Sequence, residues 1–242
     1  MPVIGTQASF ATPPVAADIT ERPSPNFGPR RDGLKPELVV LHYTAMASAE
    51  AALGVLCDPT REVSAHYLID EGGRITRLVA EDMRAWHAGA GTWAGRGDVN
   101  SRSIGIELAN DGKAPFAAPQ MAALECVLGG ILARWSINPA GVIGHSDMAP
   151  TRKRDPGARF DWRRLALRGL SVWPLAGRCD DPVDKAQWAA DAARFGYPEM
   201  AADERLATVR LRFRPWARGP LDGYDCALMA ELAARWPAGR QA

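Results

Sequence analysis

The run Leu38-Val39-Val40-Leu41-His42 sets the fold class of this 242-residue chain. Four consecutive apolar residues, two of them β-branched, predict a strand that is buried on both faces in the middle of a sheet. The strand ends at His42, and a polar ring at the end of a buried strand is costly unless it has a partner. We therefore expect a central sheet with a functional group where this strand ends.

Elements on both sides of this run complete the predicted sheet. Further strands are expected at residues 66–70, 75–79, 104–108 and 142–143, and helices are expected to begin near Ser48, Pro119 and Asp161. The strands within 66–79 flank a Gly72-Gly73 turn and predict a hairpin, whereas the apolar positions after Pro119 recur at helical spacing. Hairpins together with crossovers favour an α/β (α+β) fold, with a mixed central β-sheet flanked by helices.

The chain divides into three predicted parts. Residues 1–35 are rich in Pro, Gly and Arg and predict an N-terminal arm laid over the domain. Residues 36–176 hold the predicted sheet, and a linker near residues 177–182 leads into a small C-terminal three-helix domain over residues 180–242. Its helices are expected at Val183–Phe195, Ala202–Phe213 and Asp222–Trp236, because each pattern is followed closely by Gly or Pro.

Composition excludes several classes of protein. Lys and Arg number 29 against 28 Asp and Glu, so the net charge of +1 lacks the basic surplus typical of nucleic-acid binders. No apolar run approaches the roughly 18 residues of a membrane span. The first residues show no basic start followed by an apolar core, so we expect a cytoplasmic protein, or a periplasmic one if a leader was removed.

The histidines are the first candidates for chemistry. His42 ends a strand, His145 follows a glycine, and Asp155 lies further along in a turn. Two imidazoles and one carboxylate from separate loops leave a fourth position for water, which is the layout typical of catalytic zinc. Asp147 is a competing carboxylate beside His145. The chain has no His-Glu-x-x-His helix, which disfavours a thermolysin-like peptidase.

Five blocks of sequence, in one order, resemble a known family. They are residues 39–44 (Val-Val-Leu-His-Tyr-Thr), 63–69 (Val-Ser-Ala-His-Tyr-Leu-Ile), 85–89 (Ala-Trp-His-Ala-Gly), 103–108 (Ser-Ile-Gly-Ile-Glu-Leu) and 144–157, which holds Gly-His-Ser-Asp-Met-Ala-Pro and Arg-Lys-Arg-Asp-Pro-Gly. Together they resemble the zinc-dependent N-acetylmuramoyl-L-alanine amidases of the AmpD/AmiD type, relatives of the peptidoglycan recognition proteins. The resemblance covers about residues 22–175. The tail, around Arg212-Phe213-Arg214-Pro215, is similar to the helical peptidoglycan-binding-like domain of some AmiD-type members.

The resemblance implies roles for five residues. His42, His145 and Asp155 match the ligands of one Zn²⁺ per chain. Glu107 matches the acidic residue that acts as general base on the metal-activated water, and Lys153 matches the lysine that stabilises the oxyanion. These residue types suit the chemistry, because a carboxylate can carry a proton and a cation can share the developing negative charge. Without the resemblance, the strand pattern favours a paired structural carboxylate for Glu107.

The implied substrate carries carboxylates on its stem peptide, for which an arginine fork is the natural receptor. Arg96 matches an arginine of the family that contacts the peptide. His87 is a further candidate substrate contact, and Tyr43, beside a ligand, either contacts substrate or packs. Asp147 is then expected to cap or hydrogen-bond its own loop, and His66 to be a packed, hydrogen-bonded residue.

The function expected from the resemblance is hydrolysis of the amide between N-acetylmuramic acid and L-alanine in peptidoglycan fragments. These muropeptides, with or without a 1,6-anhydro end, are the expected partners, and the role is cell-wall recycling or degradation. One alternative is a non-catalytic peptidoglycan-recognition module, and another is a zinc amidase with a different substrate. The helical tail either caps the catalytic domain or binds glycan chains weakly.

Overall fold

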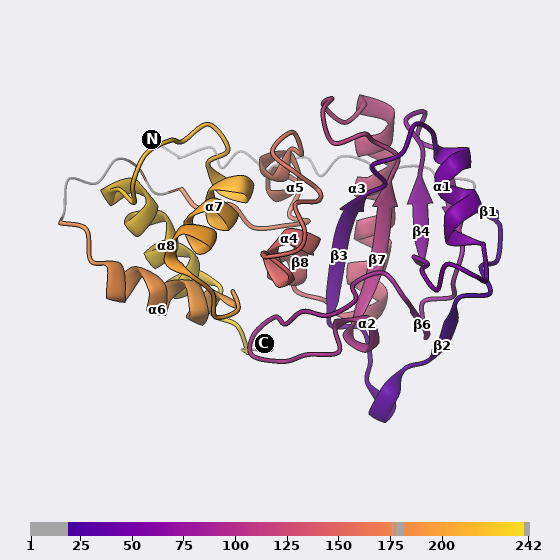
Figure 1. Ribbon diagram of the computed structural model, residues 1–242, viewed down its shortest axis with the longest axis horizontal. Coiled ribbons are helices and arrows are strands. Elements are labelled where there is room, and N and C mark those ends of the chain that lie inside the picture. The colour runs from indigo at the N-terminus through magenta and orange to yellow at the C-terminus, as the bar shows by residue number, and fades with distance from the viewer. Residues whose placement is uncertain (1–18, 176, 178–181, 240–242) are drawn as a thin grey trace, which may run out of the picture.

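The computed structural model describes residues 19–175, 177 and 182–239 (Figure 1). About half of the predicted arm, residues 1–18, and part of the predicted linker lie outside the described residues. The described chain forms a sheet with helices packed on it, and three C-terminal helices lie at one end of the molecule (Figure 1). The predicted fold class, a mixed sheet flanked by helices, is confirmed.

The central sheet has six strands in the order β1-β5-β4-β7-β3-β8. In this order they span Ile19–Glu21, Ile75–Arg77, Tyr67–Ile69, Ser103–Leu108, Leu38–Tyr43 and Val142–Gly144. β4 and β5 form the predicted antiparallel hairpin, whereas the pairs β4–β7, β7–β3 and β3–β8 are parallel. The strand that starts at Leu38 therefore lies between two parallel strands, which explains its continuous apolar sequence.

Alternation along β3 assigns its side chains to two faces of the sheet. Val39 and Leu41 belong to a cluster with residues of α3 (Ala118–Trp135) and α5 (Trp162–Leu167). Successive strand residues point to opposite faces. His42 therefore lies on the face away from α3.

Shorter helices cover that second face. α1 (Ala49–Leu56) begins at the predicted cap, where Ser48 Oγ accepts the N–H of Ala51 at 3.1 Å. It packs Leu53 with Leu68 of β4. α2 (Val99–Arg102) leads directly into β7.

The C-terminal helices α6 (Lys185–Phe195), α7 (Ala202–Phe213) and α8 (Gly223–Arg235) lie within the three predicted patterns. We call residues 182–239 the helical unit and residues 19–175 the sheet unit. One hydrophobic cluster contains buried residues of both units, among them Val40, Ile143, Met148, Trp188, Phe195 and Phe213. The two units therefore share a core.

Several short elements, α2 among them, were not expected from the sequence. Part of the predicted arm forms β1 at the sheet edge and β2 (Phe27–Pro29), which pairs with β6 (Met83–Ala85). Apolar periodicity could not reveal β1 and β2, because their side chains are mostly exposed. Residues after Gly144, expected as a loop, form the short helix α4 (His145–Met148), where Asp147 accepts the N–H of Gly144 at 2.8 Å.

Short turns complete the described chain. One-turn 3₁₀ helices occur at Arg31–Gly33 and Pro139–Gly141. Asp161 caps α5 as predicted, accepting the N–H of Arg164 at 2.9 Å. Among the described residues, no helix has both the length and the apolar character needed to cross a bilayer.

Candidate active site

Three of the predicted site residues lie at the carboxyl ends of neighbouring parallel strands. His42 is near the end of β3, Glu107 is its register partner on β7, and His145 directly follows β8. Parallel strands bring their carboxyl ends to one edge of a sheet, where open α/β sheets place their sites. The topology thereby joins two histidines that are 103 residues apart in sequence.

Asp155 completes this group. Its backbone carbonyl accepts the N–H of Ser146 at 2.9 Å, which ties its loop to α4. His42 Nδ1 lies 3.0 Å from His145 Nδ1, and Asp155 Oδ2 lies 2.9 Å from the first nitrogen and 3.0 Å from the second. All three side chains are buried. One ligand atom from each residue therefore converges on a single buried point.

The outer nitrogen of His145 shows where the ring carries its hydrogen. Nε2 lies 2.9 Å from the carbonyl oxygen of Ala88. A carbonyl can only accept, so Nε2 is the donor, and in this tautomer Nδ1 carries the lone pair that a metal ion would use. A backbone carbonyl on the outer nitrogen is a common way to orient histidine metal ligands.

His42 is oriented by a chain of side chains. Its Nε2 lies 3.0 Å from His87 Nδ1, and His87 Nε2 lies 3.2 Å from Ser103 Oγ, which donates to the Val99 carbonyl oxygen at 2.6 Å. Because that hydroxyl hydrogen is directed to Val99, Ser103 accepts from His87, and His87 accepts from His42. Burial lowers the pKa of His42 to about 4 and that of His87 well below its usual value, so both rings are neutral at pH 7. His42 Nδ1 is therefore also a free lone pair.

The converging atoms are thus two imidazole lone pairs and a carboxylate oxygen. Such acceptors repel one another at spacings of 2.9–3.0 Å unless a cation lies among them. Donors about 2.0 Å from a tetrahedral zinc ion lie about 3.3 Å apart, close to these spacings. The donor set therefore fits zinc, with two nitrogens and one oxygen from the protein.

Glu107 carries an unusual carboxyl beside this group. Burial and then the charge of Asp155 raise the pKa of Glu107 to about 8, while Lys153 acts in the opposite direction. Its Oε2 is buried and has no hydrogen-bond partner in the described part of the chain. A carboxyl with these properties in a cleft is suited to proton transfer near neutral pH.

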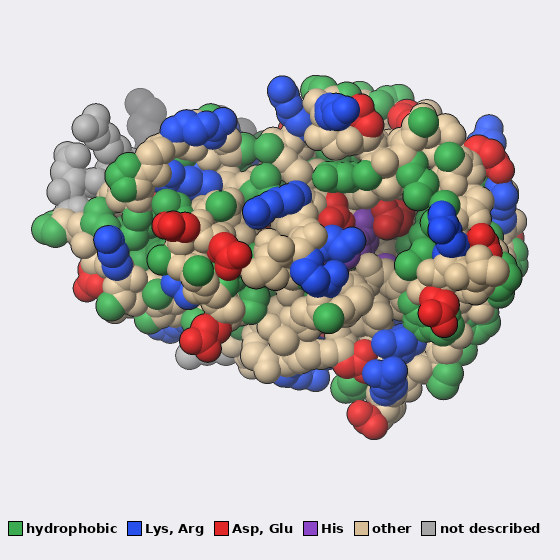
Figure 2. All heavy atoms as spheres, in the orientation of Figure 1, with side chains coloured by type: hydrophobic (Ala, Val, Ile, Leu, Met, Phe, Trp, Pro, Cys, Tyr) green, Lys and Arg blue, Asp and Glu red, His purple; other side chains and the backbone are tan. Residues whose placement is uncertain are grey.

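These residues line a cleft of about 430 Å³. In Figure 2 the cleft is a hollow with histidine side chains inside it and both kinds of charged side chain around it. Tyr43 and His87, two predicted substrate contacts, line the cleft, and so does Lys153. The structure therefore brings together seven of the eight predicted site residues.

Arg96, the predicted peptide contact, is the eighth and lies outside the cleft lining. Its Nη1 donates to Glu37 Oε1 at 2.6 Å. The cleft is lined instead by Arg152 and Arg154, on either side of Lys153. Neither arginine was predicted to have a role, because a loop arginine is usually a solvated charge. The signal that could have found them was the unbroken basic run before Asp155.

Asp147, the carboxylate that competes with Asp155 in sequence, is directed away from the converging atoms. It accepts hydrogen bonds from Gly144, Tyr197 and Arg212. A hydrogen bond to its own loop was expected for Asp147, and the contact with Gly144 is of that kind. The hydrogen bonds from Tyr197 and Arg212 of the helical unit were not expected from the sequence.

Comparisons with known proteins find relatives of this chain in one family. A family model described as N-acetylmuramoyl-L-alanine amidase matches residues 32–158. The N-acetylmuramoyl-L-alanine amidase AmiD of Escherichia coli K12 is 38% identical over 210 residues, which cover 74% of this chain and 75% of AmiD. The 1,6-anhydro-N-acetylmuramyl-L-alanine amidase AmpD of Citrobacter freundii is 34% identical over 166 residues, 62% of this chain and 89% of AmpD.

Solved structures similar to this chain include proteins of the same names. AmpDh3 from Pseudomonas aeruginosa superposes with a TM-score of 0.77 at 31% identity, covering 98% of this chain and 100% of AmpDh3. E. coli AmiD, in complex with anhydro-N-acetylmuramic acid-L-Ala-D-gamma-Glu-L-Lys, gives a TM-score of 0.74 at 36% identity over 85% of this chain and 92% of AmiD. From the family model and these matches together, the chain is an enzyme of the N-acetylmuramoyl-L-alanine amidase family.

Proposed function

We propose that this enzyme uses one zinc ion, held by His42, His145 and Asp155, to hydrolyse the amide between N-acetylmuramic acid and L-alanine in peptidoglycan fragments. The proposal depends on one observation: two imidazole nitrogens and a carboxylate oxygen converge within 3.0 Å of one another in a cleft. The relatives supply the substrate class, since AmiD and AmpD are named for this bond and AmiD was solved with an anhydro-muropeptide.

The chain's own residues supply the proton and charge chemistry. Zinc, when bound, acts as a Lewis acid that lowers the pKa of a water ligand toward neutrality. Glu107 takes a proton from the attacking water and delivers it to the amine of the departing alanine. A raised pKa, of about 8, suits a carboxyl that must first accept and then release a proton near neutral pH. Lys153 shares the negative charge that develops on the carbonyl oxygen.

The basic rim of the cleft supplies peptide recognition. Arg152 Nη2 donates to the Ala88 carbonyl oxygen at 3.3 Å and also to the Ala90 carbonyl oxygen, so its guanidinium is held at the cleft wall. Arg154, the second arginine that lines the cleft, is separated from Arg152 by Lys153 in the sequence. We assign the carboxylates of the stem peptide to these two arginines. The role predicted for Arg96 would require release of its contact with Glu37.

For the domain division and the compartment, we propose what the sequence predicts. We propose residues 36–176 as the amidase domain and residues 180–242 as a helical domain packed against it. We propose the cytoplasm as the compartment, with recycling of cell-wall fragments as the role. Fractionation of the native host with immunodetection tests the compartment, and enrichment in the periplasmic fraction would contradict it.

Digestion of defined muropeptides tests the proposed reaction. Anhydro and non-anhydro muropeptides are incubated with the full chain, with and without a chelator, and the products are identified by mass. We expect release of an intact stem peptide with alanine at its N-terminus, and loss of release when the metal is removed and in His145→Ala. Cleavage within the peptide, or full activity after complete removal of metal, would contradict the proposal. Binding without release would identify a recognition module instead.

A further inference from the structure

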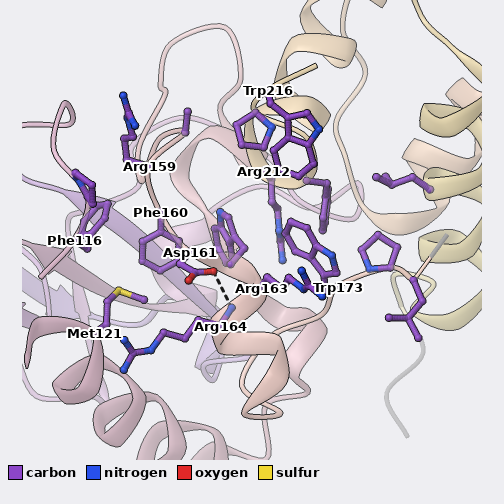
Figure 3. Close-up of a pocket in the computed structure, with 18 of the residues that line it drawn as sticks. Phe116, Met121, Arg159, Phe160, Asp161, Arg163, Arg164, Trp173, Arg212 and Trp216 are labelled. Carbon is purple, nitrogen blue, oxygen red and sulfur yellow. Dashed lines mark hydrogen bonds between the residues drawn. The ribbon is translucent and has the colours of Figure 1, made fainter. Parts of the chain in front are cut away.

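One side chain of α7 enters the sheet unit. Arg212 is 3% exposed, and its guanidinium carbon lies 4.1 Å from the centre of the Trp162 ring. It also lines a second cavity, of about 710 Å³, between the two units. Figure 3 shows Arg212 among the aromatic side chains of that cavity. A helix of one unit thus places a buried cation inside the other.

The guanidinium of Arg212 bonds to groups on both sides of His145. Nη1 donates to Asp147 Oδ2 at 2.6 Å, and Nη2 donates to the Val142 carbonyl oxygen at 3.0 Å. Val142 starts β8, and Asp147 lies in α4, which His145 begins. A single side chain therefore bridges the strand before His145 and the helix after it.

Asp147 connects these contacts to the backbone beside His145. Asp147 is 1% exposed, and its carboxylate accepts the N–H of Gly144 at 2.8 Å and the hydroxyl of Tyr197 at 3.0 Å. Tyr197 follows α6, so it also belongs to the helical unit. Two of these donors to Asp147 come from the helical unit, and the third immediately precedes His145.

Such a buried network is better suited to positioning than to stabilisation. The cost of removing both charges from water offsets much of the attraction between Arg212 and Asp147. Charge-assisted hydrogen bonds are short and directional, so they fix the groups that they join. Residues that orient metal ligands from outside typically account for about 10–100-fold in metal affinity.

We propose that the helical unit positions the ligand His145 through Arg212, Tyr197 and Asp147. This inference rests on the proposed function, in which His145 holds zinc. The three residues act through His145 and its backbone. The helical unit is accordingly part of the scaffold of the site, whether or not it also contacts glycan.

Zinc affinity of full-length variants tests this inference. We expect Arg212→Met to bind zinc about 10–100-fold more weakly than the wild type in competition with a chromophoric chelator. Tyr197→Phe, which removes one hydrogen bond and leaves the ion pair, is expected to weaken binding about 2–10-fold. The visible spectrum of the Co²⁺-substituted chain, which reports ligand geometry, should change in Arg212→Met.

Arg210→Met is the matched control. Arg210 is buried on the same helix, but its ion-pair partners Asp222 and Asp225 both lie in the helical unit. Its loss disturbs the helical unit without removing a contact to α4, so zinc affinity should equal that of the wild type.

Wild-type affinity in folded Arg212→Met and Tyr197→Phe would overturn the inference. An equal loss in Arg210→Met would also overturn it, because the effect would then be general destabilisation. If Arg212→Met does not fold, Tyr197→Phe decides the question. Failure of the wild-type chain itself to bind zinc would instead overturn the proposed function.

Discussion

His66 and His87 lie side by side at the sheet, with ring centroids 5.7 Å apart, yet their hydrogen bonds differ in kind. His66 accepts the N–H of Gly105 at 2.9 Å and its other nitrogen lies 3.1 Å from the Met83 carbonyl oxygen, so both nitrogens bond to backbone. His87 bonds to His42 and Ser103. His66 is therefore a structural residue, whereas His87 orients the proposed metal ligand His42.

Removing the acceptor at position 87 should weaken metal binding. We expect His87→Leu to lower zinc affinity about 10–100-fold, because His42 loses the partner that fixes its tautomer. His87→Asn should retain most of the affinity, since an amide oxygen can replace Nδ1 as the acceptor. Chelator competition measures both values. Equal affinities for the leucine variant and the wild type would refute the chain of hydrogen bonds as an orienting device.

Lys153 should matter for turnover and not for zinc. We expect Lys153→Ala to lower kcat about 10²–10³-fold, the usual cost of losing one oxyanion-stabilising donor. The zinc content should remain one ion per chain, because Lys153 is not among the converging ligand residues. Lys185→Ala, an exposed lysine at the start of α6, is the control and should leave kcat unchanged. A small effect on kcat with a large effect on KM would reassign Lys153 to substrate binding.

His66 should make stability depend on pH. Burial lowers the pKa of His66 to about 3, whereas an unfolded histidine titrates near 6.5. Below about pH 6.5 the unfolded chain therefore binds more protons, and the free energy of unfolding falls as the pH decreases toward 3. We expect this group to contribute a loss of about 2 kcal/mol between pH 7.5 and 5. Urea unfolding of His66→Gln should show a correspondingly smaller pH dependence; an unchanged dependence would exclude His66 as its source.

At the scale of elements, β7 has a glycine, Gly105, where the His87 side chain from another segment packs against the strand. Ser103, Gly105 and Glu107 alternate with the residues that face α3, so they lie on the cleft face. A Cβ at Gly105 would lie 2.3 Å from His87 Cγ. The glycine therefore provides the space in which the His87 ring lies against the sheet between Ser103 and Glu107.

A side chain at Gly105 should lower both the stability of the protein and its affinity for zinc. We expect Gly105→Ala to lower the free energy of unfolding by about 1–3 kcal/mol, because the ring must move away from β7. Zinc affinity should fall as well, since His87 is displaced from His42. Gly54→Ala is the control: it lies in α1, where the added Cβ would meet no atom within 4 Å beyond its own stretch of helix, and it should be stabilising by up to about 1 kcal/mol. Urea unfolding of both variants tests the contrast, and equal effects would contradict it.

For the whole molecule, the boundary between the two units is a packed interface. Gly196, at the end of α6 with φ 131°, approaches Trp93 so closely that a Cβ would lie 2.6 Å from the ring. Its carbonyl accepts the N–H of Ala94 at 2.9 Å. Together with the shared hydrophobic cluster and the Arg212–Asp147 pair, these contacts join the units along a broad surface.

The units should therefore unfold together. We expect calorimetry of the full chain to show a single transition in which the calorimetric and van't Hoff enthalpies agree. The reason is that loss of the helical unit exposes Trp93, Ile143 and Met148 of the shared cluster to water. Two resolved transitions would show that the interface is weak, and would weaken the case for positioning through Arg212.

Local patterns accounted for much of the fold. The apolar run at Leu38, the helical spacing after Pro119 and the caps Ser48 and Asp161 each depend on neighbours in sequence, and the structure confirms them. β1 and β2 escaped prediction, because an exposed strand is defined by its hydrogen bonds to a distant partner. For the site, spacing alone suggested a three-ligand metal group, and the family resemblance supplied the individual roles of Glu107 and Lys153.

The sequence by itself determined the buried strands, the longer helices and the candidate ligand types, because these follow from the order of residues along a few turns or strand lengths. Only the tertiary structure decided which groups meet. It joined His42 to His87, placed Arg152 in the cleft and Arg96 on Glu37, and put Arg212 beside Asp147. Each of these contacts joins residues on different elements, whose distance depends on how the sheet and helices pack, and no local pattern encodes that distance.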